Sequence, residues 1–194
     1  MTLHCATGNA GKLREFHALA ANRNVNFEML PEFSRLPPCE ETGATFEQNA
    51  VLKAGYYSLH ASGLLFADDS GLEVEALGGG PGVRSARFAG PRASDEANNR
   101  LLLERLRGVS DRRARFVCVI ALARAGKVVR TFHGAVEGFI LDEPRGANGF
   151  GYDPLFFYAP FGCSFGEASP ECKLAVSHRG QALRAMLDFL GPGL

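Results

Sequence analysis

Four short stretches of this 194-residue chain combine residue types that could do chemistry. In the first, ATGNAGK at residues 6–12, glycines would let the backbone approach an anion, and Lys12 adds a full positive charge. Thr7 and Asn9 can donate hydrogen bonds to phosphate oxygens. The stretch lacks the spacing and the final hydroxyl residue of a Walker phosphate loop. Taken alone, it is better explained as an ordinary strand-to-helix turn.

The second stretch is ADDSG, residues 67–71. Two carboxylates at the end of a strand, followed by a glycine turn, could bind a divalent cation or orient a water molecule. Adjacent side chains of an extended chain point to opposite faces, so at most one of Asp68 and Asp69 should face the site. An Asx turn that ends the strand is the alternative interpretation.

The third stretch is GFGYDP, residues 149–154. An aromatic ring between two glycines has room to present its face to a planar ligand, and Asp153 could meet a donor on the edge of a base. A loop that contributes aromatic side chains to the core is the alternative interpretation.

The fourth stretch joins Lys173 to the run Ser177-His178-Arg179. Ser177 predicts a helix cap, which puts His178 and Arg179 in a first turn where positive charge opposes the helix dipole. Either they face an acceptor, or they are solvated first-turn residues. Together the four stretches supply phosphate binders, acidic groups for a metal, an aromatic platform and a basic pair. These are the parts of a nucleotide site.

The elements that must position these stretches alternate between strand and helix patterns, which predicts a mixed α/β fold and one folding unit with two lobes, residues 1–194. Apolar and β-branched runs predict strands at residues 3–6, 63–67, 115–124, 127–134 and 136–141. The strands at 115–124 and 127–134 are predicted to form a hairpin around Ala125-Gly126. Helical periodicity predicts helices at residues 11–22, 45–62, 94–107 and from 177. Loops rich in glycine or proline are predicted at residues 24–44, with room for an edge strand, 78–92 and 144–154.

Composition excludes several classes of protein. Lysine plus arginine equals aspartate plus glutamate, 21 each, so no global basic field favours binding to a nucleic-acid polymer. The five cysteines form no CxxC pair and leave one over, a pattern typical of free thiols in a reducing cytosol. No apolar run approaches the length of a membrane span or a signal-peptide core. We therefore expect a cytoplasmic protein with no membrane partner.

In order and spacing, five segments resemble the inosine/xanthosine triphosphate pyrophosphatase family: ATGNAGKLREF, EETGATFEQNAVLKA, ADDSGLEVEALGGGPGVRSARFAG, GFGYDPLFF and KLAVSHRGQAL. The resemblance extends from residue 6 to about residue 187. It implies an elongated mixed sheet flanked by helices, with two lobes around a central cleft, and usually a homodimer. It also implies magnesium-dependent hydrolysis of ITP, dITP and XTP to the monophosphate and pyrophosphate.

The resemblance also implies roles for individual residues. Asp69 would be the general base and a Mg²⁺ ligand, Glu41 the second acidic ligand, and Lys53 a catalytic lysine that contacts phosphate. The implied triphosphate contacts are Thr7, Gly8, Asn9, Ala10, Gly11 and Lys12, and Ser70 is a further implied substrate contact. The implied purine pocket consists of Phe150, Gly151, Tyr152 and Asp153, with Phe150 stacking on the base. Lys173, His178 and Arg179 would reach the base and the phosphates.

Two departures from the family pattern bear on this expectation. Family members often have glutamate where this chain has Gln48, but a T-x-x-Q capping box from Thr45 gives that position a structural task. Leu174 replaces a common polar residue and should adjust only the pocket wall. The alternatives are a non-catalytic purine nucleotide-binding module and a phosphatase that releases single phosphates. The loop at residues 78–92 is the candidate for a dimer contact or the rim of the cleft.

Overall fold

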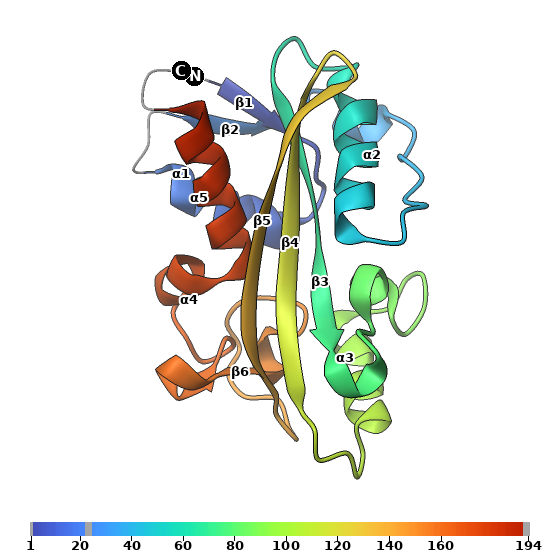
Figure 1. Cartoon of the computed structure of the whole chain (residues 1–194), viewed down its shortest axis with the longest axis vertical. Helices are drawn as coiled ribbons and strands as arrows, with labels where there is room; N and C mark the ends of the chain where they lie inside the picture. Colours follow the sequence, from blue (N-terminus) through green and yellow to red (C-terminus); the bar gives the residue numbers. More distant parts are fainter. Residues whose placement is uncertain (1, 22–24, 192–194) are drawn as a thin grey trace. The chain divides into compact units, whose positions relative to one another are not determined.

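The computed structural model describes residues 2–21 and 25–191 (Figure 1). Its helices are α1 (Ala10–Ala20), α2 (Phe46–Ser58), α3 (Asp95–Arg105), α4 (Pro170–Val176) and α5 (His178–Leu190). Its strands are β1 (Thr2–Cys5), β2 (Asn26–Met29), β3 (Leu65–Val74), β4 (Arg113–Arg124), β5 (Lys127–Ile140), β6 (Phe156–Tyr158) and β7 (Cys163–Ser164). Within these residues, no helix combines the length and the apolar character needed to cross a membrane.

The strands found in the described residues form one sheet in the order β2-β1-β3-β4-β5-β6-β7. Strand β1 runs parallel to β2 and β3, whereas β6 runs antiparallel to β5 and β7. The sheet is therefore mixed and flanked by helices, which confirms the α/β class. Strand β2 lies at one end of the order, so the edge strand allowed for within residues 24–44 is confirmed.

The chain divides into two compact units. Unit 1 comprises Met1–Asp69, Cys118–Gly134 and His178–Leu194, and unit 2 comprises Ser70–Val117 and Ala135–Ser177. Helices α1, α2 and α5 therefore belong to unit 1, and α3 and α4 belong to unit 2. Strands β3, β4 and β5 each contribute residues to both units.

The core of unit 1 lies between its strands and the pair α1 and α5, which pack against each other. Phe16 of α1 meets Phe66 of β3 edge to face, with ring centroids 5.1 Å apart. The α5 face from Ala182 to Leu190 is buried in this core, whereas His17 of α1 is exposed. Helix α2 lies on the other side of these strands (Figure 1).

The core of unit 2 is built around aromatic side chains. Phe156 lies between Phe116 and Phe165, with ring centroids 4.5 and 5.0 Å apart. Leu102 of α3 and Leu106, the residue that ends this helix, are fully buried in the same cluster. This packing fixes α3 as a rigid support within unit 2.

Several predicted boundaries were wrong. Strand β3 does not end at residue 67 but continues to Val74, because Lys12 and Lys53 compensate the charge of its two aspartates. Residues 127–140 form one long strand, not two. Helix α2 ends at Ser58 rather than at residue 62. Helix α4 was missed, and Ser177 is its C-cap as well as the residue that precedes α5. Residue 22 of the predicted first helix lies outside the described residues.

Candidate active site

The segment at residues 7–12 belongs to unit 1; it connects β1 to α1 and includes the first residues of this helix. Asn9 is the helix cap: its Oδ1 accepts a hydrogen bond from the backbone N–H of Lys12 at 3.0 Å. Thr7 Oγ1 accepts from the backbone N–H of Asn9 at 3.2 Å. The first turn of α1 has no acidic residue, so its positive end is not neutralised within the helix. A Cβ on Gly8 would make only an ordinary 3.6 Å contact, so internal packing does not require glycine there.

The two aspartates of β3 point to opposite faces, as strand alternation requires. Asp68 shares the face of Phe66 and points towards α1 and α5. Its Oδ2 lies 2.8 Å from Lys12 Nζ and 3.7 Å from Arg179 Nε. Asp69 points towards α2, where its Oδ1 accepts from Lys53 Nζ at 3.0 Å. The expectation of opposite faces is confirmed, and an Asx turn at this position is wrong because the strand continues.

The two carboxylates differ in their electrostatic surroundings. Burial of Asp68, whose side chain is 1% exposed, opposes ionisation, but the positive charges of Lys12, Arg179 and Lys53 lower its pKa to about 2. Burial raises the pKa of Asp69 above its ordinary value, and Lys53 only partly offsets this effect. Asp68 is therefore a fixed negative charge, whereas Asp69 has the raised pKa expected of a general base.

Lys53 connects Asp69 to Glu41. Its Nζ lies 3.0 Å from Asp69 Oδ1 and 3.1 Å from Glu41 Oε2. Burial would lower the pKa of Lys53, but the nearby carboxylates of Asp69, Asp68 and Glu41 raise it above its ordinary value. The ammonium therefore stays charged and draws two carboxylates to one point.

Asp69 and Glu41 both approach the Lys53 ammonium, and this closeness of two carboxylates is the observation that bears on a metal site. Carboxylate oxygens are ligands that Mg²⁺ prefers, and this ion usually takes one or two of them together with water and substrate phosphates. The described residues contain no group of three or more His, Cys, Asp or Glu side chains that could hold a metal ion by themselves. Asp69 and Glu41 therefore fit Mg²⁺ as a pair that leaves other coordination positions to substrate and water.

The basic pair at the start of α5 is buried, so the alternative of solvated first-turn residues is wrong. Gly134 of β5 allows this burial, because a Cβ there would lie only 2.0 Å from the backbone oxygen of His178. Arg179 Nη1 donates to Glu15 Oε2 of α1 at 2.5 Å. Glu15 and Asp68 thus hold the guanidinium from two sides.

The predicted purine residues belong to unit 2. The Asp153 carboxylate is buried, and its Oδ2 accepts hydrogen bonds from the backbone N–H of Phe150 at 2.8 Å and from Lys173 Nζ at 2.5 Å. Lys173 Nζ lies 4.9 Å from the ring centroid of half-buried Phe150, a cation–π distance. Asp153, Lys173 and Phe150 therefore form one bonded group.

Tyr152 and Ser70 complete the predicted contacts in unit 2. The Tyr152 ring lies in the unit 2 core, and its hydroxyl donates to the Ser85 backbone oxygen at 2.8 Å. Burial and the charge of Asp95 raise the pKa of Tyr152 above its ordinary range. Ser70 is the first residue of unit 2, directly after Asp69. The structure gives Tyr152 a packing role, and its contact with a purine stays a prediction.

Sequence reasoning missed two residues of unit 1, Glu15 and Asn49. Asn49 Nδ2 donates to Asp69 Oδ2 at 3.2 Å, and Asn49 lies one helical turn before Lys53. Glu15 lies three residues after Lys12 on α1. Residues three or four apart share a helix face, so each could have been found from its spacing to a predicted lysine.

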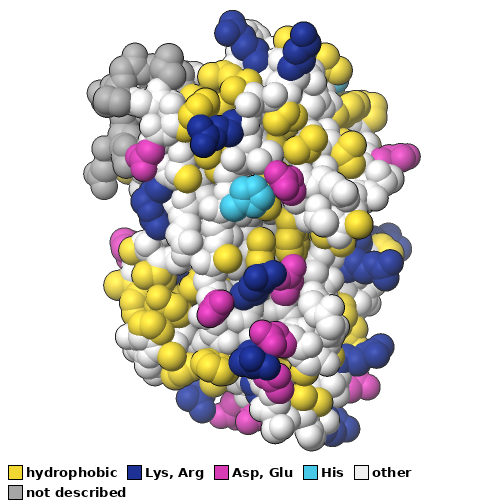
Figure 2. Space-filling view, in the orientation of Figure 1, with side chains coloured by type: hydrophobic (Ala, Val, Ile, Leu, Met, Phe, Trp, Pro, Cys, Tyr) yellow, Lys and Arg dark blue, Asp and Glu magenta, His cyan; other side chains and the backbone are white. Residues whose placement is uncertain are grey.

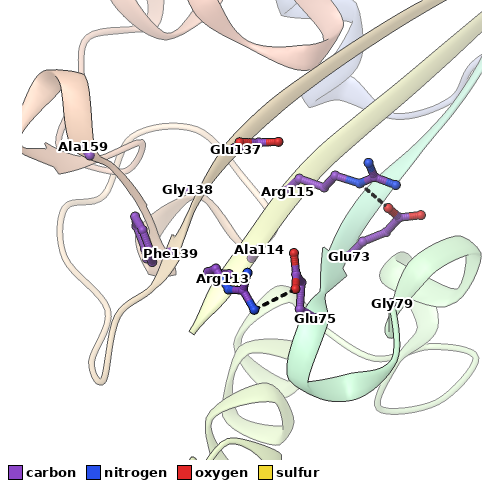
Figure 3. Close-up of a pocket in the computed structure, with 10 residues that line it drawn as sticks. All are labelled: Glu73, Glu75, Gly79, Arg113, Ala114, Arg115, Glu137, Gly138, Phe139 and Ala159. Carbon is purple, nitrogen blue, oxygen red and sulfur yellow. Dashed lines mark hydrogen bonds and ion pairs between the residues drawn. The ribbon is translucent and has the colours of Figure 1, made fainter. Parts of the chain in front are cut away.

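A pocket of about 580 Å³ in unit 2 contains none of the predicted site residues (Figure 3). Arg115 pairs with Glu73 at 2.6 Å and Arg113 with Glu75 at 3.0 Å across its floor. Figure 2 shows basic and acidic side chains interspersed over this part of β3, β4 and β5. Partly exposed pairs such as these contribute about 0–1 kcal/mol each, and the pocket is best explained as a solvated sheet face.

Comparison with known proteins finds a matching family model and close relatives over nearly the full length of the chain. The Ham1 family model matches residues 3–189. A dITP/XTP pyrophosphatase of Acidobacterium capsulatum is 48% identical, with 100% of this chain and 99% of that protein covered. One of Thermus thermophilus is 50% identical, with 100% of this chain and 93% of that protein covered.

Solved structures give the same result. A HAM1 protein from Coxiella burnetii superposes with a TM-score of 0.88 at 41% identity, covering 98% of both chains. The Staphylococcus aureus Ham1 protein superposes with a TM-score of 0.87 at 40% identity, also covering 98% of both chains. The sequence match, the relatives and the fold agree over nearly the full length. This chain belongs to the Ham1 family.

Proposed function

We propose that this protein hydrolyses non-standard purine nucleoside triphosphates, namely ITP, dITP and XTP, to the monophosphate and pyrophosphate. The observation that carries the proposal is the arrangement in unit 1. Lys12 and Lys53 are each bonded to one of two adjacent aspartates, and each also lowers the pKa of the other aspartate, so both positive charges act on the same pair of carboxylates. The names of the related dITP/XTP pyrophosphatases support the same substrate class.

In the proposed reaction, Asp69 accepts a proton from a water molecule that attacks the α-phosphorus. Its raised pKa suits this task, because a base is most effective when its pKa approaches the working pH. Lys53 stays protonated and neutralises negative charge that develops on the departing pyrophosphate. Lys12, held by Asp68, adds a second positive charge beside the start of α1.

The proposal includes Mg²⁺ held by Asp69 and Glu41. A triphosphate repels a bare carboxylate, by roughly 4 kcal/mol for two unit charges 4 Å apart at an effective dielectric near 20. When bound, Mg²⁺ would supply charge neutralisation and would lower the pKa of a coordinated water. Lys53 lies between the same two carboxylates, so it can hold them together before a metal binds.

The proposal assigns discrimination between purines to His178 and Arg179, and stacking to Phe150. Glu15 and Asp68 fix the Arg179 guanidinium, so it is preorganised as a donor. A donor pairs with the 6-keto oxygen of hypoxanthine or xanthine but meets another donor at the 6-amino group of adenine. A buried mismatch of this kind costs about 1–3 kcal/mol per group.

Gln48 is the feature that favours a non-catalytic module. In the structure the Gln48 Oε1 accepts from the backbone N–H of Ala44 at 2.7 Å, and the backbone N–H of Gln48 donates to Thr45 Oγ1 at 3.2 Å. Gln48 therefore caps α2, which glutamine does as well as glutamate. This observation supports an active enzyme despite the departure from the family pattern.

Product analysis tests the proposal and its alternatives. The enzyme should convert ITP with Mg²⁺ to IMP and pyrophosphate, and Asp69→Asn should lose most of this turnover. Release of IDP and phosphate would identify a phosphatase that releases single phosphates. Binding of ITP without any product would identify a non-catalytic module.

A single domain with two lobes, a homodimer and a cytoplasmic location complete the proposal. The five free cysteines suit a reducing compartment. The loop at residues 78–92 is the proposed dimer contact, and part of it is fixed by Ser85, whose Oγ accepts from the backbone N–H of Leu72 at 2.9 Å. Sedimentation of the purified protein as a monomer would remove the dimer from the proposal.

A further inference from the structure

The segment that carries Phe150 has little secondary structure of its own. Residues 141–152 contain no helix or strand, and most of them are exposed. Gly146, Gly149 and Gly151 all have positive φ, at 77°, 76° and 63°. A loop of this kind holds one conformation only where other elements bond to its backbone.

Helix α3 supplies such bonds at the residue directly after Phe150. Asp95 Oδ2 accepts from the backbone N–H of Gly151 at 2.6 Å, and Asn99 Nδ2 donates to the backbone oxygen of Gly151 at 3.0 Å. Asp95 and Asn99 are four residues apart, so their side chains lie one above the other on the same helix face. The helix thus binds both polar backbone groups of one residue.

We propose that Asp95 and Asn99 act as a peptide clamp that positions the Phe150 ring for the purine. The inference rests on the proposed function of Phe150. The clamp fixes the backbone after Phe150, while Asp153 fixes the backbone N–H of Phe150 itself. With both sides held, the direction of the Phe150 side chain is set before a ligand arrives.

Helix α3 is suited to this task because it is anchored independently of the loop. Leu102 and Leu106 hold it in the unit 2 core, and Ser94 caps its start by accepting from the backbone N–H of Ala97. Sites that depend on a rigid element for their geometry lose precision when the connection is cut, even if the element itself survives. Asp95 and Asn99 are therefore positioning residues, and neither is assigned a part in phosphate chemistry.

The adjacent residue provides a matched control. Asn98 is also buried, but its amide bonds a different loop, donating to the Ala86 oxygen at 3.3 Å and accepting from the Ala89 N–H at 2.8 Å. Asn99→Ala and Asn98→Ala each remove a buried amide from the same helix, so both should lower the unfolding temperature. Only the first removes a bond to Gly151.

The test measures kcat and KM for ITP separately, together with hydrogen exchange of a peptide that contains Gly151. Asn99→Ala should raise KM roughly fivefold with kcat within about twofold. It should also speed exchange at Gly151, because only the bond from the Gly151 N–H to Asp95 then remains of the two clamp bonds. Asn98→Ala should leave both quantities unchanged. Asp95→Asn should keep KM near the wild-type value because an amide oxygen can still accept from Gly151, whereas Asp95→Leu should raise it.

Two results would overturn the clamp: an unchanged KM and exchange rate in Asn99→Ala, or an equal rise of KM in Asn98→Ala. If the wild-type protein released no pyrophosphate from ITP, the proposed function would fail. The exchange measurement would then still decide whether the clamp holds the loop.

Discussion

Replacing Asp68 with asparagine removes the carboxylate that holds Lys12 and lies beside Arg179. The substitution keeps the shape of the side chain, so its effect is electrostatic. The Asp68 pKa falls from an ordinary 3.8 to about 2 in the folded protein. At 1.36 kcal/mol per pKa unit, the ionised group contributes on the order of 2 kcal/mol to stability at neutral pH.

Loss of the buried ion pair gives a larger value. Removing one partner of a buried ion pair typically costs about 3–5 kcal/mol, because the other charge stays buried without compensation. Here Glu15 still pairs with Arg179, which limits the loss. We therefore expect a cost of roughly 2–4 kcal/mol, or a fall of about 4–16 °C in the unfolding temperature for a protein of this size.

The assay is urea unfolding of wild type and Asp68→Asn between pH 7 and pH 2. Because the folded pKa of Asp68 is depressed, its contribution is complete above the unfolded pKa and is lost as the pH falls from about 4 towards 2. The difference in free energy of unfolding between wild type and Asp68→Asn should shrink over that pH range. Asp142→Asn is the control, since the Asp142 carboxylate is 87% exposed and pairs with Arg112 at the surface. A loss at pH 7 no larger in Asp68→Asn than in the control would refute the reasoning.

Three further predictions test other parts of the structure. Lys53→Met should lower kcat by roughly 100-fold. Because Lys53 lowers the pKa of Asp69, the acid limb of the plot of kcat/KM against pH should also move to higher pH in this variant. An acid limb that does not move would contradict the coupling between Lys53 and Asp69. Gln48→Ala should cost about 0.5–1.5 kcal/mol in urea unfolding and leave kcat unchanged, whereas a metal ligand at this position would show a weaker Mg²⁺ dependence. Gly149→Ala should lower the free energy of unfolding more than Gly151→Ala. Both glycines have positive φ, but only a Cβ at residue 149 would overlap a neighbouring side chain, 2.0 Å from Asp153 Oδ2. Equal losses of stability in the two variants would contradict this packing.

Much of the fold could be predicted because local patterns and tertiary packing agree. Helix α2 begins after its predicted cap Thr45 and buries Phe46 and Ala50. The hairpin of β4 and β5 turns at Ala125-Gly126, both with positive φ, as the glycine indicated. These signals are short-range, so the sequence alone carries them.

Predictions that failed depended on distant partners. Two adjacent aspartates and a glycine favour a turn locally, yet β3 continues through them because Lys12 and Lys53 neutralise the two carboxylates from opposite faces. For the same reason, no local pattern marked Arg179 as buried. Its burial depends on Glu15, which is 164 residues away in the sequence.

The central claim is that the site cleaves the non-standard triphosphates ITP, dITP and XTP and discriminates against the 6-amino group of adenine. The most direct test is steady-state kcat/KM for pyrophosphate release from ITP, dITP, XTP, ATP and GTP with Mg²⁺. We predict that kcat/KM for ITP, dITP and XTP exceeds that for ATP by at least roughly 30-fold, the minimum effect of two mismatched donors. Equal rates for ATP and ITP, or no pyrophosphate from any of them, would contradict it.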